Sequence, residues 1–225
     1  MNVTSNVPPV GIALIACSSA RIAGNQITNI GPLNIAFSSS AGIAITAPFD
    51  RAEVSNNVIR RSDPVAPGIS DWRALYLGPL AGFAGGFKHN LVQIAPGQFI
   101  FVGDFVVAAV VEGTQLAAVR GNVLAGASSG SFAPTGSFVE LTVVGSCVFT
   151  DNQAIFVVPG SRPLARLSAP MVAAGNNILT GGTPSLQIQA PTGGKFTVLG
   201  NVASGPILVN GAALAAPWEP LNMHG

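Results

Sequence analysis

Most of the side chains that could do chemistry in this chain lie in one stretch. Eight charged residues fall between Asp50 and Arg73, although the 225 residues include only ten basic and nine acidic ones. Trp72 lies in the same stretch, and Tyr76 follows it. Aromatic rings beside planar hydrogen-bonding groups are typical of surfaces that bind sugars or proteins. The sequence therefore predicts a binding site made of Arg60, Arg61, Asp63, Asp71, Trp72, Arg73 and Tyr76.

A structural role explains the same pattern. A long loop from Arg60 to Arg73 needs polar residues in any case, and Trp72 can pack back onto the body of the protein. The two interpretations differ in what Trp72 contributes, which is binding in one case and stability in the other.

Enzymatic cleavage of a polysaccharide needs carboxylates, or a carboxylate and a base, at facing positions. Asp63 and Asp71, beside Trp72, are the candidate acids for such a site near residues 60–73. Elsewhere the acids do not align with one another. Glu112, which precedes the Gly113 break, falls level with Val144, and Glu140 falls near Ala108. Metal-ligand spacings are absent, so we expect no metal and no cofactor. The sequence favours a non-catalytic protein and keeps a carbohydrate-active enzyme as the alternative.

A repeated asparagine motif runs through the chain and must position these residues. Each copy reads apolar, two variable positions, Asn, one variable position, apolar, as in Val119-Arg120-Gly121-Asn122-Val123-Leu124. Repeats of 20 to 50 residues are typical of solenoids, whose units bury their apolar faces by stacking. The intervals between the asparagines are 32, 33, 32, 30, 24 and 25 residues. The asparagines are Asn25, Asn57, Asn90, Asn122, Asn152, Asn176 and Asn201.

Two short apolar runs, separated by a Gly, Pro or Ser break, precede most of these asparagines. The runs are rich in branched residues, and no stretch shows a helical period with capping signals. Stacked at one corner, the asparagine amides can bond one another or the turn backbone. We therefore expect parallel strands throughout and an asparagine ladder.

The Gly-Asn-x-Ile motif and the repeat length resemble those of the right-handed parallel β-helix repeats in the pectate-lyase-like superfamily. The resemblance implies an all-β, right-handed parallel β-helix of seven to eight coils. A single domain over residues 1–225 would then be part of a larger protein or assembly. That superfamily includes polysaccharide lyases, hydrolases, epimerases, phage tailspikes and adhesins, so the resemblance indicates a fold and not a function.

The composition limits the kinds of partner that this chain can bind. Only 8% of residues are charged and 48% are hydrophobic, which excludes a disordered chain. The net charge of +1 argues against nucleic-acid binding, and no apolar run is long enough to span a membrane. A surface this weakly charged is typical of one covered by other subunits, although a plain monomer remains the alternative. We therefore expect self-association or a protein partner, with a glycan as a further ligand.

These observations favour a structural or binding module that resembles a stalk, fibre, adhesin or tailspike and presents loops to its partner. Such a module would be extracellular, on a cell surface or on a virion-like particle. Leu14-Ile15-Ala16-Cys17 resembles a lipoprotein cleavage box, but the residues before Gly11 lack the Lys or Arg of a signal peptide.

The repeat also predicts individual contacts. Arg21 and Glu53 each lie four residues before an asparagine, so they should pair, and His89 should face solvent at its corner. Cys17 and Cys147 lie too many levels apart for a disulfide. The outward row of the first strands should read Ala44, Tyr76, Val110, Thr142, Arg166, Gln187 and Leu208.

Overall fold

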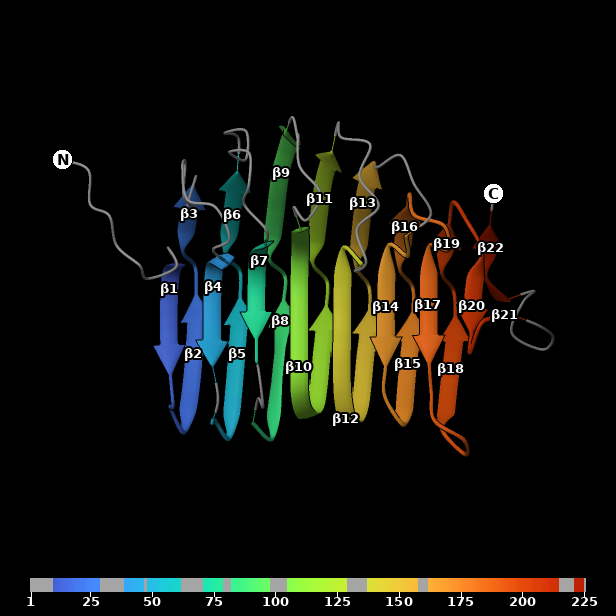
Figure 1. Ribbon diagram of the computed structural model, residues 1–225, viewed down its shortest axis with the longest axis horizontal. Coiled ribbons are helices and arrows are strands. Elements are labelled where there is room, and N and C mark those ends of the chain that lie inside the picture. Colours follow the sequence, from blue (N-terminus) through green and yellow to red (C-terminus); the bar gives the residue numbers. More distant parts are fainter. Residues whose placement is uncertain are drawn as a thin grey trace.

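The computed structural model describes residues 10–28, 39–46, 48–61, 71–78, 82–97, 105–128, 137–157, 162–214 and 221–224. Within these residues the regular structure is almost entirely β-strand, and the strands stack into one long solenoid (Figure 1). Each level contains a first strand, a second strand after a bend, and a third strand after the asparagine corner. The fold is the right-handed parallel β-helix that the repeat predicted.

The first and second strands belong to one 14-stranded sheet because β10 and β12 run through the bend. We call its two parts the first face and the second face. The first face consists of β1 (Val10–Ile15), β4 (Ser39–Thr46), β7 (Asp71–Leu77), the start of β10 (Phe105–Arg120), the start of β12 (Val139–Thr150), β14 (Ala165–Ser168), β17 (Leu186–Gln189) and β20 (Ile207–Val209). The second face consists of β2 (Ser19–Ala23), β5 (Arg51–Ser55), β8 (Ala84–Lys88), the ends of β10 and β12, β15 (Met171–Gly175) and β18 (Lys195–Leu199).

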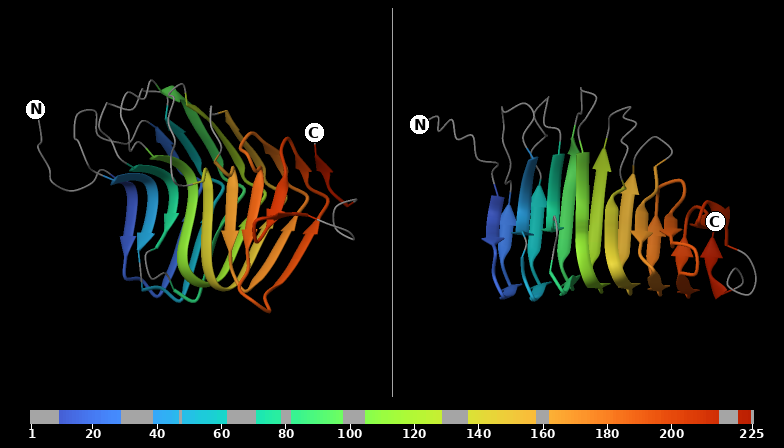
Figure 2. Two further views of the ribbon diagram at one scale, coloured as in Figure 1. Left: turned by 45° about the vertical axis from the view of Figure 1, so that its right-hand side comes forward. Right: turned by 60° about the horizontal axis from the view of Figure 1, so that its bottom comes forward.

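The third strands form a separate 8-stranded sheet on the other side of the asparagine corner (Figure 2). Its strands are β3 (Gln26–Thr28), β6 (Val58–Arg61), β9 (Leu91–Gly97), β11 (Val123–Ser128), β13 (Gln153–Val157), β16 (Ile178–Thr180), β19 (Val202–Ala203) and β22 (Met223–His224). Strand pairing is parallel as predicted, with one exception. The short β21 (Ala212–Ala213) pairs antiparallel with β20 near the C-terminal end of the stack.

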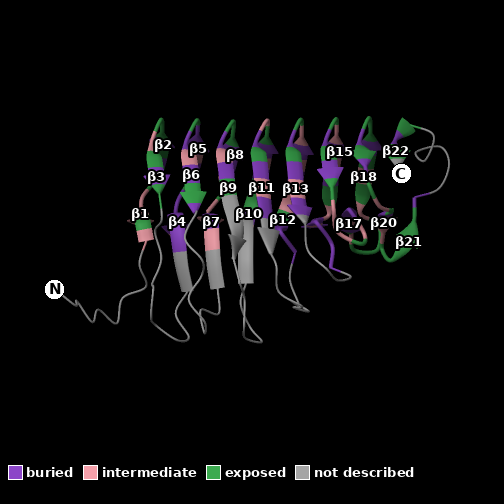
Figure 3. Cartoon of the chain, turned by 90° about the horizontal axis from the view of Figure 1, so that it is seen from above, coloured by how far each residue is buried: buried purple, intermediate pink, exposed green. Residues whose placement is uncertain are grey.

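Apolar side chains from all three strands of each level fill the interior. Alternate residues of a strand point inward, and the same inward position recurs at the next level (Figure 3). The largest fully buried rings are Phe87, Phe138 and Phe149. Cys17 and Cys147 are free thiols, as predicted, and burial raises the pKa of the Cys147 thiol to about 12.

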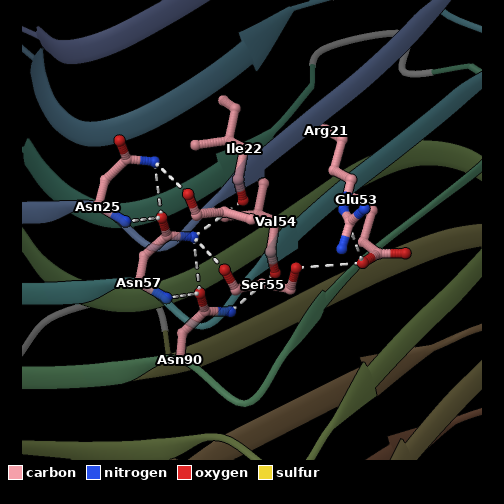
Figure 4. Close-up of polar contacts among 9 residues, drawn as sticks. Arg21, Ile22, Asn25, Glu53, Val54, Ser55, Asn57 and Asn90 are labelled. Carbon is pink, nitrogen blue, oxygen red and sulfur yellow. Dashed lines mark hydrogen bonds and ion pairs between the residues drawn. The ribbon is translucent and has the colours of Figure 1, made fainter.

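The predicted asparagine ladder is present at the corner between second and third strands (Figure 4). Each asparagine donates from its backbone N–H and from Nδ2 to the Oδ1 of the asparagine one level on, at 2.8 to 3.1 Å. From the second asparagine onward, Nδ2 also donates to a backbone carbonyl of the previous level, such as Phe87 O for Asn122 at 3.0 Å. That carbonyl belongs to the apolar residue three positions before the previous asparagine, which explains the motif's spacing.

The sixth ladder residue is Asn177, so the prediction of Asn176 was wrong by one position. Asn177 is fully buried and bonds both Asn152 and Asn201, whereas Asn176 is exposed. Asn176 has φ 54°, and the residue before each of the other six predicted ladder asparagines is likewise left-handed, for example His89 at 53° and Asp151 at 59°. In the Asn176-Asn177 pair the first residue makes the turn and the second enters the ladder. Asn222 continues the ladder beyond Asn201, a member that the sequence reading missed.

Candidate functional site on the first face

A row of polar side chains faces outward across the middle of the first face. The strand register places Tyr76 opposite Val110, Val110 opposite Glu140, Glu140 opposite Arg166, and Arg166 opposite Gln187. The predicted row contained Thr142 in place of Glu140, which was wrong. Thr142 lies one row further along, where it pairs with Glu112 and Ser168. The correction puts an acid directly beside Arg166.

Tyr76 is held between a cation and an acid. The guanidinium of Arg73 lies over the Tyr76 ring, 4.5 Å from its centre, and the Tyr76 hydroxyl donates to Glu112 Oε2 at 3.1 Å. Burial raises the pKa of Tyr76 to about 12, and the charge of Glu112 adds to the rise. Gly78 packs closely against this contact: its φ is 151°, and a Cβ there would lie 3.2 Å from both the Tyr76 hydroxyl and Glu112 Oε2.

Glu140 and Arg166 form the second contact of the row. Arg166 donates from one terminal nitrogen to Glu140 Oε1 at 3.4 Å and from Nε to Gln187 Oε1 at 3.3 Å. Both charged side chains are more than two-thirds buried. Burial raises the pKa of Glu140, and the charge of Glu112 raises it further, while Arg166 opposes the rise. Glu112 and Glu140 are therefore close enough to influence each other's ionisation.

Arg162 is a buried cation whose charge interacts with that of Glu140. Its guanidinium lies 4.8 Å from the centre of the Phe156 ring, and Phe156 stacks on Phe138 at 4.2 Å. Burial lowers the pKa of Arg162 to about 10, and the charge of Glu140 opposes that change. The charged groups of the row are therefore partly removed from water. Hydrogen bonds to charged groups are stronger in such an environment than in water.

The predicted binding residues whose side chains the structure describes do not gather at one place. Arg73 and Tyr76 lie together on the first face, but Arg60 is exposed on the third sheet, where its Nε donates to Gln93 Oε1 at 2.8 Å. Arg61 is buried, with 3% of its surface exposed, so it is not a surface contact. Asp63 lies outside the described residues, as do the side chains of Asp71 and Trp72, although their backbone belongs to β7. Within the described residues, the predicted site is split between two sheets.

Four charged residues in or near the row were not predicted as a site: Glu112, Glu140, Arg162 and Arg166. The expected levels of Glu112 with Val144 and of Glu140 with Ala108 were wrong, because they align Gly113 with Gly145, which are 32 residues apart. The strands β10 and β12 pair with an offset of 30 residues, the same as between Asn122 and Asn152, apart from a local irregularity at Thr114. Counting back ten residues from Asn122 and Asn152 would have paired Glu112 with Thr142 correctly.

Other predicted contacts are confirmed. Arg21 Nε lies 3.8 Å from Glu53 Oε1, and His89 is exposed at its corner.

Among the described residues, no group of three or more His, Cys, Asp or Glu is arranged to bind a metal ion. The described part of the chain likewise contains no helix that is long and apolar enough to cross a membrane.

Searches of protein-family models, curated proteins and solved structures found no match to this chain. The fold and the geometry of the first face are therefore what indicates a function for this chain.

Proposed function

We propose that this chain is a non-catalytic β-helix module that binds a linear saccharide along its first face. The observation that carries the proposal is the outward row of Glu140, Arg166 and Gln187 on successive strands, with Tyr76 two levels before Glu140 and the buried Val110 between them. Strands of a stack are about 4.8 Å apart, so a polymer lying along the solenoid would meet Glu140, Arg166 and Gln187 at successive levels. Planar hydrogen-bonding groups beside an aromatic ring suit the hydroxyls and apolar faces of sugars.

A length series of linear oligosaccharides, followed by isothermal titration calorimetry, tests this proposal. Affinity should rise with each added sugar until the ligand spans the row, and then level off. Arg166→Gln should weaken binding by about tenfold, since a hydrogen bond to a charged group contributes about 1.5–3 kcal/mol. Lys195→Gln removes a charge from the second face and is the matched control. Affinity that is independent of length, or equal losses in both variants, would reject the proposal.

A carbohydrate-active enzyme is the second candidate, because Glu112 and Glu140 are neighbouring carboxylates. They lie on adjacent strands and are offset by two residues, which separates their Cα atoms by about 8 Å. In this mechanism Glu140, whose pKa is raised, would be the acid and Glu112 the base. Both carboxylates already have partners in Tyr76 and Arg166, which favours binding without cleavage. Reducing ends released by the wild type but not by Glu140→Gln would establish the enzyme.

The outer row of the third sheet supports self-association of this module. Its exposed apolar members are Val123, Ile178, Val202 and Met223, each between 38% and 66% exposed, and the exposed Gln153 lies between Val123 and Ile178. Such a stripe is typical of a surface that another subunit covers. We expect a second copy of the chain to cover it in a fibre or stalk outside the cell or on a particle. Light scattering should show an oligomer that Ile178→Lys dissociates, and a concentrated wild type that stays monomeric would contradict this.

A further inference from the structure

The second face carries a groove of about 470 Å³ that is separate from the row of Tyr76 and Glu140. Its walls come from β5, β8, β10 and β12, on levels that follow one another in the stack. A groove of this volume lies in the range of small-molecule binding sites.

Small residues in the middle of the strands make the groove hollow. The central outward position is Glu53 in β5, Gly86 in β8, Ala118 in β10 and Val148 in β12. Gly86 cannot carry a side chain, because a Cβ there would collide with the backbone oxygen of Ala118. The floor between Glu53 and Val148 is therefore only backbone and one methyl group.

Two cations face each other on one side of this floor. Lys88 and Arg120 are register partners on neighbouring parallel strands, and both are exposed and line the groove. Like charges directly opposite each other on neighbouring strands repel and destabilise the sheet. In the part of the chain that the structure describes, neither residue forms an ion pair with an acid. The repulsion between Lys88 and Arg120 costs stability, and no acid of the described chain offsets it. Such a pair of cations suits an anionic ligand.

The remaining charges keep the groove positive. Arg51 lines its opposite side, and among the described lining residues Glu53 is the one acid. Glu53 already accepts a hydrogen bond from Ser55 Oγ at 3.1 Å and pairs with Arg21 at 3.8 Å (Figure 4). The charge of Glu53 is thus offset from outside the groove, which leaves three cations to face a ligand.

The geometry points to a binding site for a phosphate monoester of a small polar molecule, with the phosphate between Lys88 and Arg120. A phosphate group carries nearly two negative charges at neutral pH and three acceptor oxygens, so it can bond both cations at once. The polar body of the ligand would lie over the floor, within reach of Ser146 and Glu53. An acidic peptide suits the groove less well, since the flanking strands are already paired on both sides and offer its backbone no partners.

Calorimetry with glucose 6-phosphate, inorganic phosphate, glucose and a hexaglutamate peptide tests this site on the full chain. Glucose 6-phosphate should bind, inorganic phosphate should bind more weakly and compete with it, and glucose should not bind. Equal affinity for inorganic phosphate and for glucose 6-phosphate would reject the ester and leave only a simple anion site. Equal or tighter binding of the peptide would assign the groove to acidic protein segments instead.

Variants separate a built site from general attraction to positive charge. Lys88→Gln and Arg120→Gln should each weaken glucose 6-phosphate binding by about tenfold, as expected for the loss of one charged hydrogen bond. Each variant should also melt at the same temperature as the wild type or slightly above it, because the repulsion between the two cations is relieved. Lys195→Gln, on the same face but outside the groove, should change neither property. An equal loss of binding in Lys195→Gln, or a lower melting temperature in Lys88→Gln and Arg120→Gln, would overturn the proposal.

Discussion

The asparagine corner and the first face use polar residues in opposite ways. At the corner the same side chain recurs at every level, almost fully buried from Asn57 onward, and each amide bonds its neighbours in the same geometry. On the first face every level differs, as Tyr76, Val110, Glu140, Arg166 and Gln187 follow one another. Repetition at the corner satisfies buried groups and holds the levels in register. Variation on the face creates a surface with its own chemistry.

Removing one rung of the ladder should have the largest effect. Asn122→Ala deletes the acceptor of both Asn90 donors and the Nδ2 donor to Phe87 O. Buried groups that lose their partners cost about 1–3 kcal/mol, which urea unfolding will measure. Asn25→Ala should cost less, because Asn25 is only partly buried and lies at the first level of the ladder. An equal loss in both variants would show that the burial of a ladder asparagine does not determine the cost of removing it.

Variants of the Asn176-Asn177 pair should separate the two roles of the corner residues, which are to make the turn and to form the ladder. Asn177→Ala should lose about 1–3 kcal/mol, like Asn122→Ala, because it breaks bonds to both Asn152 and Asn201. Asn176→Gly should change stability by less than about 0.5 kcal/mol, since glycine accepts the left-handed backbone and the side chain is exposed. A larger loss of stability in Asn176→Gly than in Asn177→Ala would show that Asn176 is the ladder residue, as the sequence first suggested.

Tyr76 reports directly on the first face because it is the only tyrosine in the chain. Its phenolate absorbance should titrate near pH 12 in the folded protein, above its ordinary value of 10.0. A raised pKa stabilises the fold below pH 10, and that stability is lost as the pH rises through the folded value. Glu112→Gln should move the titration toward 10. An unchanged midpoint would mean that Glu112 does not act on Tyr76.

The smallest expected effect is the pH response of Glu140. Its folded pKa lies above the ordinary 4.5, so the folded state keeps its proton longer than the unfolded state. The wild type should therefore gain stability, relative to Glu140→Gln, as the pH falls toward 4.5. Thermal melts of the two proteins across this range measure the difference. A wild type that loses stability on acidification relative to the variant would show that Arg166 outweighs burial.

The corner could be predicted from the sequence because its physics is local and repeated. Six of the seven predicted ladder asparagines are correct, and the error at Asn176 arose where two asparagines adjoin. Burial distinguishes them, since Ala174 and Leu179 face the core around Asn177, whereas Ile178 is exposed. A sequence in which Ala173 and Ala174 are both apolar does not reveal that difference.

The first face could not be predicted to the same degree, because its neighbours depend on the length of every bend. Glu140 and its partner Arg166 are 26 residues apart, whereas the ladder residues of the same two levels, Asn152 and Asn177, are 25 apart. The Arg21–Glu53 pair, in contrast, lies only four residues from the corner and was predicted correctly. Register is therefore harder to predict across the bend, and the candidate site lies beyond it on the first strands.

Unfolding and oligosaccharide binding, measured together on Asn122→Ala and Arg166→Gln, test the central claim that the corner holds the fold and the first face binds. Asn122→Ala should lose about 1–3 kcal/mol of stability while the folded protein keeps its affinity. Arg166→Gln should lose about tenfold in affinity, while its partly exposed ion pair costs less than about 1 kcal/mol of stability. If both variants lost stability and affinity in the same proportion, or if the wild type bound none of the oligosaccharides, the division between corner and face would be contradicted.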